Sequence, residues 1–340
     1  MNNTIRRQVK ELWKLCFDDN EKFIDLYFNL RFNQNVNISI ESGNQIIAAL
    51  QMLPYTLTYF GEDFQTSYIS GACTHPDYRN RGVMHRLIGS ALARMSAEGM
   101  TFSALIPAED WLFDYYAKLG FAAVCDYAMR DIIYTPLKQS CSKIERISEF
   151  RPDVYKYLNF KMHKRDFCIQ HSDSDIKVVM EDMKVEENGN VWIASRESNV
   201  VGVMFVYKEN GINYIAELLT DTNKVKQELI QAICNAEPQT PLKLIAPVNE
   251  KDEHIKHGMI RIVNVPKALQ FFAVHHPDLI MNLTIDDPML SSNNNYYYLY
   301  KGRCMVSKEK LPGKHTEFTM TQLAQFLFEG VHPYMSLMMD

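Results

Sequence analysis

The stretch Ser70-Gly71-Ala72-Cys73-Thr74-His75-Pro76-Asp77-Tyr78-Arg79-Asn80-Arg81-Gly82-Val83-Met84 decides how the first part of the chain is expected to fold. It begins inside an apolar strand, Tyr68–Thr74, and ends in a helix whose apolar side chains recur at helical spacing from Met84 to Met95. A short loop joins the two elements. The order strand, loop, helix directs backbone N–H groups of the first helical turn toward a bound anion.

The composition of this loop favours a phosphate-containing ligand, and a pyrophosphate group is the expected one. Arg79 and Arg81 add positive charge, and Gly82 permits a close approach of the backbone. The alternative is a solvated basic turn with a structural glycine. The strand and helix on either side favour the anion site.

Length, charge and cysteine content exclude several classes of protein. The chain has 340 residues, which at roughly 100–200 residues per domain predicts two or three domains. The formal net charge of -5 provides no overall basic field, so we expect no nucleic-acid partner. Its 7 cysteines form no Cys-x-x-Cys pair, which favours reduced thiols in the cytoplasm. No apolar run approaches the ~20 residues of a membrane span, so we expect no membrane partner.

The hydrophobic pattern predicts a mixed α+β fold in three sections. One amphipathic helix is expected over Leu12–Leu30, and paired strands are expected over Phe121–Tyr134. The middle section repeats the order of three strands, a helix and a strand more weakly. We therefore predict domains at residues 1–137, 138–257 and 258–340.

Two motifs in the first section resemble those of the GNAT superfamily of acetyltransferases. Arg79, Gly82 and Met84 are similar to its coenzyme A-binding motif, Gln/Arg-x-x-Gly-x-Gly/Ala, with Met84 in place of the final small residue. The run from Tyr115 to Phe121 resembles the ending Tyr-x-Lys-x-Gly-Phe. The resemblance implies acetyl-CoA as co-substrate and Tyr116 as the acid that protonates the departing thiolate.

The same resemblance implies which residues contact acetyl-CoA. Main-chain groups of Ala72 and Thr74 are expected to contact its acetyl and pantetheine portions, while Cys73 between them is interpreted as a core thiol. The expected cofactor-binding residues are Ala72, Cys73, Thr74, Arg79, Asn80, Arg81, Gly82, Val83 and Met84. Where the family commonly has an Asn, this chain has Glu109, which either favours the dipole of the next helix or acts as a base.

The whole chain resembles the Eis (enhanced intracellular survival) type, which joins two GNAT modules to a sterol-carrier-protein-like C-terminal domain. The run Ile260–Leu269 is similar to the family's entry into that last domain. The middle section lacks the coenzyme A motif, so we predict that it binds none. In this type the C-terminus returns to the first module, which implies the terminal carboxylate of Asp340 as base, and the proteins are homo-oligomers.

The expected function is acetyl transfer to a primary amine such as an aminoglycoside, a polyamine or a lysine side chain. A catalytically silent acyl-CoA sensor is the alternative. Aminoacyl transfer from transfer RNA is disfavoured by the net charge. His254, His257 and the pair His275-His276 are interpreted as surface histidines, so no metal is expected, and His75 is interpreted as a capping residue.

Overall fold

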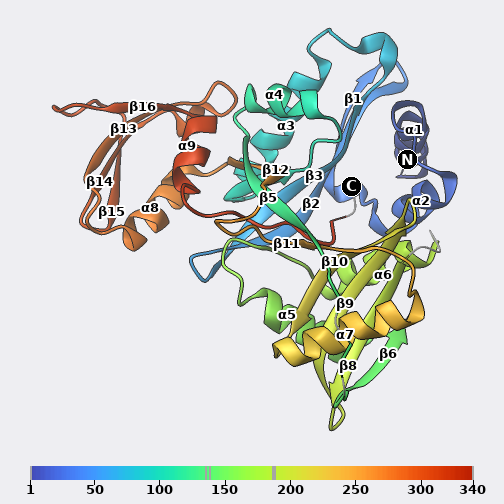
Figure 1. Ribbon diagram of the computed structural model, residues 1–340. Coiled ribbons are helices and arrows are strands. Elements are labelled where there is room, and N and C mark those ends of the chain that lie inside the picture. The colour runs from blue at the N-terminus through green and yellow to red at the C-terminus, as the bar shows by residue number, and fades with distance from the viewer. Residues whose placement is uncertain (1, 135, 138, 186–188, 339–340) are drawn as a thin grey trace.

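The computed structural model describes residues 2–134, 136–137, 139–185 and 189–338, arranged in three parts (Figure 1). The first module, drawn in blue to green, packs against the second module, drawn in green to yellow, and the third domain lies to one side in orange and red. Helices flank large mixed sheets in the modules, and a separate small sheet forms the third domain. The predicted mixed α+β class is confirmed.

Besides a π-helix at Tyr27–Arg31 and two short 3₁₀ helices, the described residues of the first module form four α-helices and five strands. They are α1 (Asn2–Cys16), α2 (Glu21–Leu26), β1 (Asn37–Ser42), β2 (Gln45–Tyr59), β3 (Glu62–Thr74), α3 (Val83–Ala97), β4 (Phe102–Leu105), α4 (Asp110–Ala117) and β5 (Ala122–Asp131).

Two expectations for the first module are wrong. The helix expected over Leu12–Leu30 is interrupted after Cys16, and the Asn20 side chain begins α2 by accepting a hydrogen bond from the Phe23 N–H at 2.8 Å. Asn and Asp side chains compete with helical hydrogen bonds in this way. Where paired strands are expected over Phe121–Tyr134, the structure has one strand, β5 (Ala122–Asp131), whose neighbours come from distant sequence.

Strand β12 (Ile255–Ile262) lies between β4 and β5 and pairs antiparallel with both. A segment that follows the second module therefore completes the sheet of the first. On its other side, β5 pairs with β11 (Leu242–Ala246) of the second module, so the two modules share one 12-stranded sheet. Eleven of its strands follow the order β1-β2-β3-β4-β12-β5-β11-β10-β9-β8-β6, and the short β7 (Ile169–Gln170) pairs with β2 outside this order. The strands β6 (Lys143–Ile147), β8 (Gly189–Arg196), β9 (Asn199–Glu209) and β10 (Ile212–Thr220) belong to the second module.

The second module repeats the strand-strand-strand-helix-strand order of the first. Its elements are β6 (Lys143–Ile147), α5 (Pro152–Met162), β7 (Ile169–Gln170), α6 (Asp173–Val185), β8 (Gly189–Arg196), β9 (Asn199–Glu209), β10 (Ile212–Thr220), α7 (Asn223–Ala236) and β11 (Leu242–Ala246).

The third domain packs two helices against a four-stranded sheet of order β15-β14-β13-β16. Its elements are α8 (Val265–His275), β13 (Met281–Asp286), β14 (Tyr296–Tyr300), β15 (Arg303–Ser307), β16 (Thr316–Thr319) and α9 (Met320–Leu327). Its likeness to sterol carriers stays a prediction. Within the described residues, no helix is both long and apolar enough to span a membrane.

After α9 the chain runs back to the junction of the two modules (Figure 1). Tyr334 forms a bridge with Cys168, and its N–H donates to the Phe167 carbonyl at 2.7 Å. Tyr334, Met335 and Ser336 are buried, and Leu337 and Met338 are half-buried. The terminal segment is therefore packed up to Met338; Met339 and Asp340 lie outside the described residues.

Candidate active site

A bulge in β3 shapes the first module at the residues that the sequence singles out. Ser70 pairs with Gln51 and Cys73 with Ala49, so β3 carries one residue more than β2 across this interval. Gly71 lies in the extra turn with φ 60°, and a Cβ there would meet the Trp13 ring at 2.0 Å. Only glycine fits both the backbone conformation and the contact with Trp13.

Beyond the bulge, β3 separates from its parallel neighbour β4. The two strands pair only from Thr66 to Tyr68 on β3 and from Phe102 to Ala104 on β4. The backbone groups of Ala72 and Thr74, further along β3, therefore lie past the last paired residue of β4. A splay of this kind leaves strand N–H and C=O groups available to a ligand that enters between the strands.

The loop after β3 and the first turn of α3 have the features of an anion site. Gly82 is the N-cap of α3 with φ 70°, no side chain caps the first turn, and that turn contains no acidic residue. A Cβ at Gly82 would meet no heavy atom within 4 Å, so the space at this helix end is open. Uncapped N–H groups and the helix dipole both favour a negative charge here.

The two arginines of the loop lie differently. Arg79 folds back and donates from Nε to the Thr74 carbonyl at 3.2 Å, which ties the loop to the end of β3. The guanidinium of Arg81 lies over the Tyr78 ring, 5.5 Å from its centre. Met84 is half-buried and packs against the core beneath α3, which accounts for a large residue at the last motif position.

The thiols of Cys16 and Cys73 lie next to each other and close to Arg79. Cys16 of α1 donates a hydrogen bond to the Thr74 carbonyl at 3.4 Å. Contacts with the Cys73 thiol and then with Arg79 lower the pKa of Cys16 to about 7. The Cys16 thiol and burial raise the pKa of Cys73 well above its ordinary value, which agrees with its interpretation as an unreactive core thiol.

Tyr116 lies in the last turn of α4 with only 7% of its surface exposed. Burial raises the pKa of Tyr116, and Tyr115 and Cys73 add to the shift, so the phenol stays protonated and lies near β3. Among the residues that the structure describes, none forms a hydrogen bond with this hydroxyl. A buried phenol of this kind can donate to a ligand in the splay.

Strand β12 and the third domain together hold the end of α4 in place. The fully buried Arg261 donates to the Leu119 carbonyl through Nη1 and to Asp287 through Nη2, the latter at 2.6 Å. The Thr321 hydroxyl donates to the Ala117 carbonyl at 2.7 Å. These contacts add side-chain donors to carbonyls at and after the helix end, and so they fix the turn that follows Tyr116.

A cavity of about 360 Å³ lies between the second module, β5, β12 and the terminal segment. Aromatic rings of Tyr127, Tyr207, His257 and Tyr334 line it, together with the carboxylate of Asp182. Its described lining contains no lysine or arginine. A Cβ on Gly258 would meet the Met335 sulfur at 2.4 Å and the Leu105 carbonyl at 3.4 Å, so the terminal segment passes close to the end of β4.

The second module has its own bulge and splay, and there the terminal segment fills the space. β10 carries an extra residue at Ala216, and it pairs with β11 only from Asn213 to Ile215. Past these residues, Ser336 Oγ donates to the buried Glu217 at 2.9 Å and the Tyr334 hydroxyl reaches the Ile245 carbonyl at 3.5 Å.

Residues Tyr334–Ser336 of the terminal segment, which fill this space, are called the plug below. The buried Glu217 holds the plug in place. Both of its oxygens accept hydrogen bonds from Arg165, at 2.6 and 2.8 Å, and its side chain is 2% exposed. The Ser336 carbonyl meets His171 Nε2 at 2.7 Å. At the start of α7, the Thr222 side chain caps the Val225 N–H at 3.3 Å, so this helix end differs from the uncapped start of α3.

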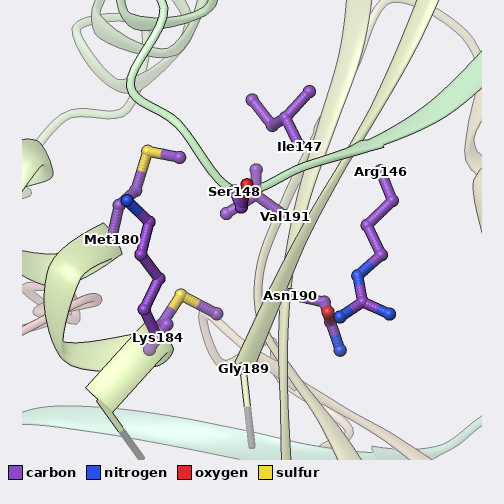
Figure 2. Close-up of a pocket in the computed structure, with 9 residues that line it drawn as sticks. Arg146, Ile147, Ser148, Met180, Lys184, Gly189, Asn190 and Val191 are labelled. Carbon is purple, nitrogen blue, oxygen red and sulfur yellow. The ribbon is translucent and has the colours of Figure 1, made fainter. Parts of the chain in front are cut away.

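A second hollow, of about 270 Å³, lies on the second module between α6 and the strands β6 and β8 (Figure 2). In Figure 2, Met180 and Lys184 project from the helix, while Arg146 and Asn190 lie on the strands. The Lys184 ammonium pairs with Glu149 at 2.9 Å and with Glu181 at 2.7 Å. The described residues that line this hollow include none of the predicted site residues.

The remaining predicted residues have these positions. His75 caps the turn Pro76–Tyr78 by accepting from the Asp77 N–H at 3.3 Å, as expected. Glu109 is the N-cap of α4 and accepts from the Trp111 indole at 2.7 Å. Asp340 lies outside the described residues.

The sequence interpretation overlooked several residues of this region. The apolar pattern alone assigns no role to Gly71, although a glycine inside a strand often marks a bulge. Cys16, Arg261, Glu217 and Thr321 come from segments far from the motif, and their proximity depends on the fold.

The matching family model is the acetyltransferase (GNAT) domain, which covers residues 1–124. Among curated proteins, no sequence matches significantly.

Three solved structures share the fold of nearly the whole chain. A GCN5-related N-acetyltransferase from Anabaena variabilis has a TM-score of 0.74 at 17% identity, covering 95% of this chain and 87% of its own. A probable N-acyltransferase from Enterococcus faecalis, described as a conserved protein of unknown function, has a TM-score of 0.76 at 16% sequence identity. The match covers 95% of this chain and 87% of that protein. Eis1 from Mycobacterium abscessus has a TM-score of 0.70 at 10% sequence identity, and the match covers 96% of this chain and 87% of that protein. Residues 1–124 therefore match a GNAT acetyltransferase domain, and the chain shares its overall fold with N-acetyltransferase structures of similar length.

Proposed function

We propose that this protein is an acetyl-CoA-dependent N-acetyltransferase that acts on a primary amine. The observation that carries the proposal is the opened β3–β4 pair, which has an uncapped helix end on one side and the buried Tyr116 hydroxyl beside it. The same region holds the residues that match the family motif. Acetyl-CoA supplies the acetyl thioester; the chain supplies the binding groups and the proton donor.

In this proposal, the amides of Arg79–Met84 hold the pyrophosphate and the main chain of Ala72–Thr74 holds the pantetheine and acetyl portions. Strand N–H groups polarise the thioester carbonyl as the amine attacks. The nitrogen–carbon bond forms, the carbon–sulfur bond breaks, and Tyr116 donates its proton to the departing thiolate. No covalent intermediate on the protein is required, which leaves Cys73 without a chemical role.

We assign the cavity beside the terminal segment to the acceptor amine. Its aromatic rings, single described carboxylate and lack of described lysine or arginine suit a cation with an apolar body. The Tyr127 and His257 rings meet edge to face at 5.3 Å, and Tyr207 stacks on Tyr214 at 5.2 Å. Rings held in this way form a fixed wall for a ligand.

A carboxylate of Asp340, in its side chain or its main chain, remains our proposed partner for the amine. Its unperturbed pKa is too low for a strong base, so it would hold the ammonium and pass its proton to water. Deleting Leu337–Asp340 is expected to lower turnover at least tenfold without unfolding the protein, and Asp340→Asn is expected to have a smaller effect. A truncated enzyme with parental turnover would leave Glu109 or water as the base.

The experiment that tests the function is thiol release from acetyl-CoA with a panel of polyamines, aminoglycosides and lysine peptides. Release that depends on an amine, with the acetylated amine detected by mass spectrometry, is the expected result. Binding of acetyl-CoA without release by any amine would instead support a silent sensor. Light scattering in the same samples tests the homo-oligomer that the Eis resemblance implies.

A further inference from the structure

Three side chains from distant parts of the sequence meet where β5, β12 and the terminal segment come together. Asp126 lies on β5, His254 directly precedes β12, and His332 lies between α9 and the bridge at Tyr334. One ligand atom from each lies within 4.8 Å of the others. We propose that Asp126, His254 and His332 form a binding site for a divalent transition metal of the zinc type.

The spacing of the donors fits this assignment. Zinc bonds to His and Asp are about 2.0–2.2 Å long, so two ligands at a tetrahedral angle lie roughly 3.4 Å apart. His254 Nδ1 and Asp126 Oδ2 are 3.4 Å apart. The rings of His254 and His332 are 4.8 Å apart and nearly perpendicular, at 87°, so they approach from different directions. Small side-chain rotations bring all three donors to one ion.

The donor atoms of the three side chains are not taken up by hydrogen bonds from other described residues. Among the residues that the structure describes, none forms a hydrogen bond with the side chains of Asp126, His254 or His332. Lys256 is paired with Asp126 across the strands, but its ammonium lies over the Phe113 ring, 6.0 Å from the centre. The carboxylate of Asp252 interacts electrostatically with His254 and adds negative charge nearby.

The donor set selects the class of metal. Two imidazoles and one carboxylate suit zinc and similar transition metals, whereas magnesium and calcium prefer oxygen ligands. Asp126 and His254 are 19% and 36% exposed, so water has access to the fourth position. The site differs from the proposed acetyl-transfer site in its residues and does not depend on that function.

A metal ion bound here would hold the terminal segment against β5 through His332. His332 is separated by one residue from Tyr334, where the plug of the second module begins. Binding an ion would link this point to β5 and to the segment before β12. Because an unfolded chain does not hold the three donors together, metal binding should stabilise the folded protein.

Zinc titration of the full-length, chelator-treated protein by calorimetry tests the site. One saturable ion per chain is expected, together with a zinc-dependent rise in melting temperature, and magnesium should produce neither. His254→Ala and His332→Ala should each weaken zinc binding by at least about tenfold, because even indirect ligand partners contribute 10–100-fold.

The matched control is His163→Ala. His163 Nε2 lies 3.5 Å from Asp63 Oδ2, a similar pair, and among the described residues this pair is not part of a three-ligand group. This variant should keep the parental zinc affinity. Absence of saturable zinc binding, or unchanged affinity in both His254→Ala and His332→Ala, would overturn the proposal. Because each variant is also melted without zinc, misfolding is detected separately.

Discussion

The two modules contain the same bulged strand beside a parallel partner, yet they use the resulting space in opposite ways. In the first module, β3 and β4 separate beside an uncapped helix end and a loop with two arginines. In the second, β10 and β11 separate around the chain's own terminal segment, which Glu217 anchors. A shared backbone therefore does not make two equal sites; the loop and the occupant of the splay distinguish them.

The loops that lead from the bulged strand into the next helix also differ between the two modules. Between β10 and α7 the chain has only Asp221 and Thr222, and Asp221 pairs with Lys161 at 2.8 Å. An acidic residue and a side-chain cap at this helix end disfavour a phosphate ligand. We therefore expect one functional site for acetyl-CoA in each chain, in the first module.

The largest effect is expected at Tyr116, which has no counterpart role in the second module. Tyr116→Phe should lower kcat by about 10²–10⁴-fold, because the phenol no longer protonates the leaving thiolate. Affinity for acetyl-CoA, measured by calorimetry, should change little. Tyr115→Phe is the matched control and should keep most of the turnover. Full turnover in Tyr116→Phe would assign the proton donor elsewhere.

The plug of the second module should depend on Glu217. Glu217→Ala leaves the guanidinium of Arg165 without its buried partner and is expected to cost about 3–5 kcal/mol of unfolding free energy. Glu21→Ala is the control, because it removes a pair with Lys14 at 2.9 Å in which Glu21 is 84% exposed. Denaturant unfolding should show a much smaller loss for the control, because solvent screens an exposed ion pair. Equal losses would contradict the assigned role of Glu217.

The bulge of the first module should depend on the absence of a Cβ at Gly71. Gly71→Ala forces a methyl group into Trp13 and places a side chain at positive φ, which together should cost about 2–5 kcal/mol. Gly99→Ala has φ 77° and meets nothing within 4 Å, so it isolates the conformational part. That control should cost about 1–2 kcal/mol. If both variants unfold at the same denaturant concentration, contact with Trp13 does not constrain the bulge.

The smallest effect concerns the thiol beneath the anion loop. Alkylation of Cys16 should follow a pKa of about 7, so its rate should rise through neutral pH, where an ordinary thiol is still protonated. Mass spectrometry of the Cys16 peptide after brief exposure to iodoacetamide measures this rate. Arg79→Gln should move the rise to higher pH. A rise centred near the ordinary thiol pKa in the parent protein would contradict the contacts described for Cys16.

Local sequence predicted much of the first module, because strand, loop and helix signals were contiguous from Tyr68 to Met95. It also located Tyr116 at the end of a helix. It failed where the partner of a segment lies far away: the neighbours of β5 are β11 and β12, and no local pattern reveals them. The break after Cys16 depends on the competition of Asn20 with the helix, which a purely apolar pattern does not register.

The sequence singled out the loop residues but not the contacts that support them. Arg261 meets the end of α4 because β12 inserts between β4 and β5, and Thr321 meets it because the third domain packs there. The same holds for His332, which approaches Asp126 only through the return of the terminal segment. From sequence alone, each histidine is interpreted by its own neighbours. The structure instead brings His254, His332 and Asp126 together from three separate segments.

Calorimetric titration of acetyl-CoA tests the central claim, that only the first splay is a cofactor site. We predict one molecule bound per chain, with binding abolished by Arg79→Glu combined with Arg81→Glu. The equivalent double reversal at the start of α7, Lys224→Glu with Lys226→Glu, should leave the affinity unchanged. Two molecules per chain, or unaltered affinity in the Arg79→Glu, Arg81→Glu protein, would contradict the claim.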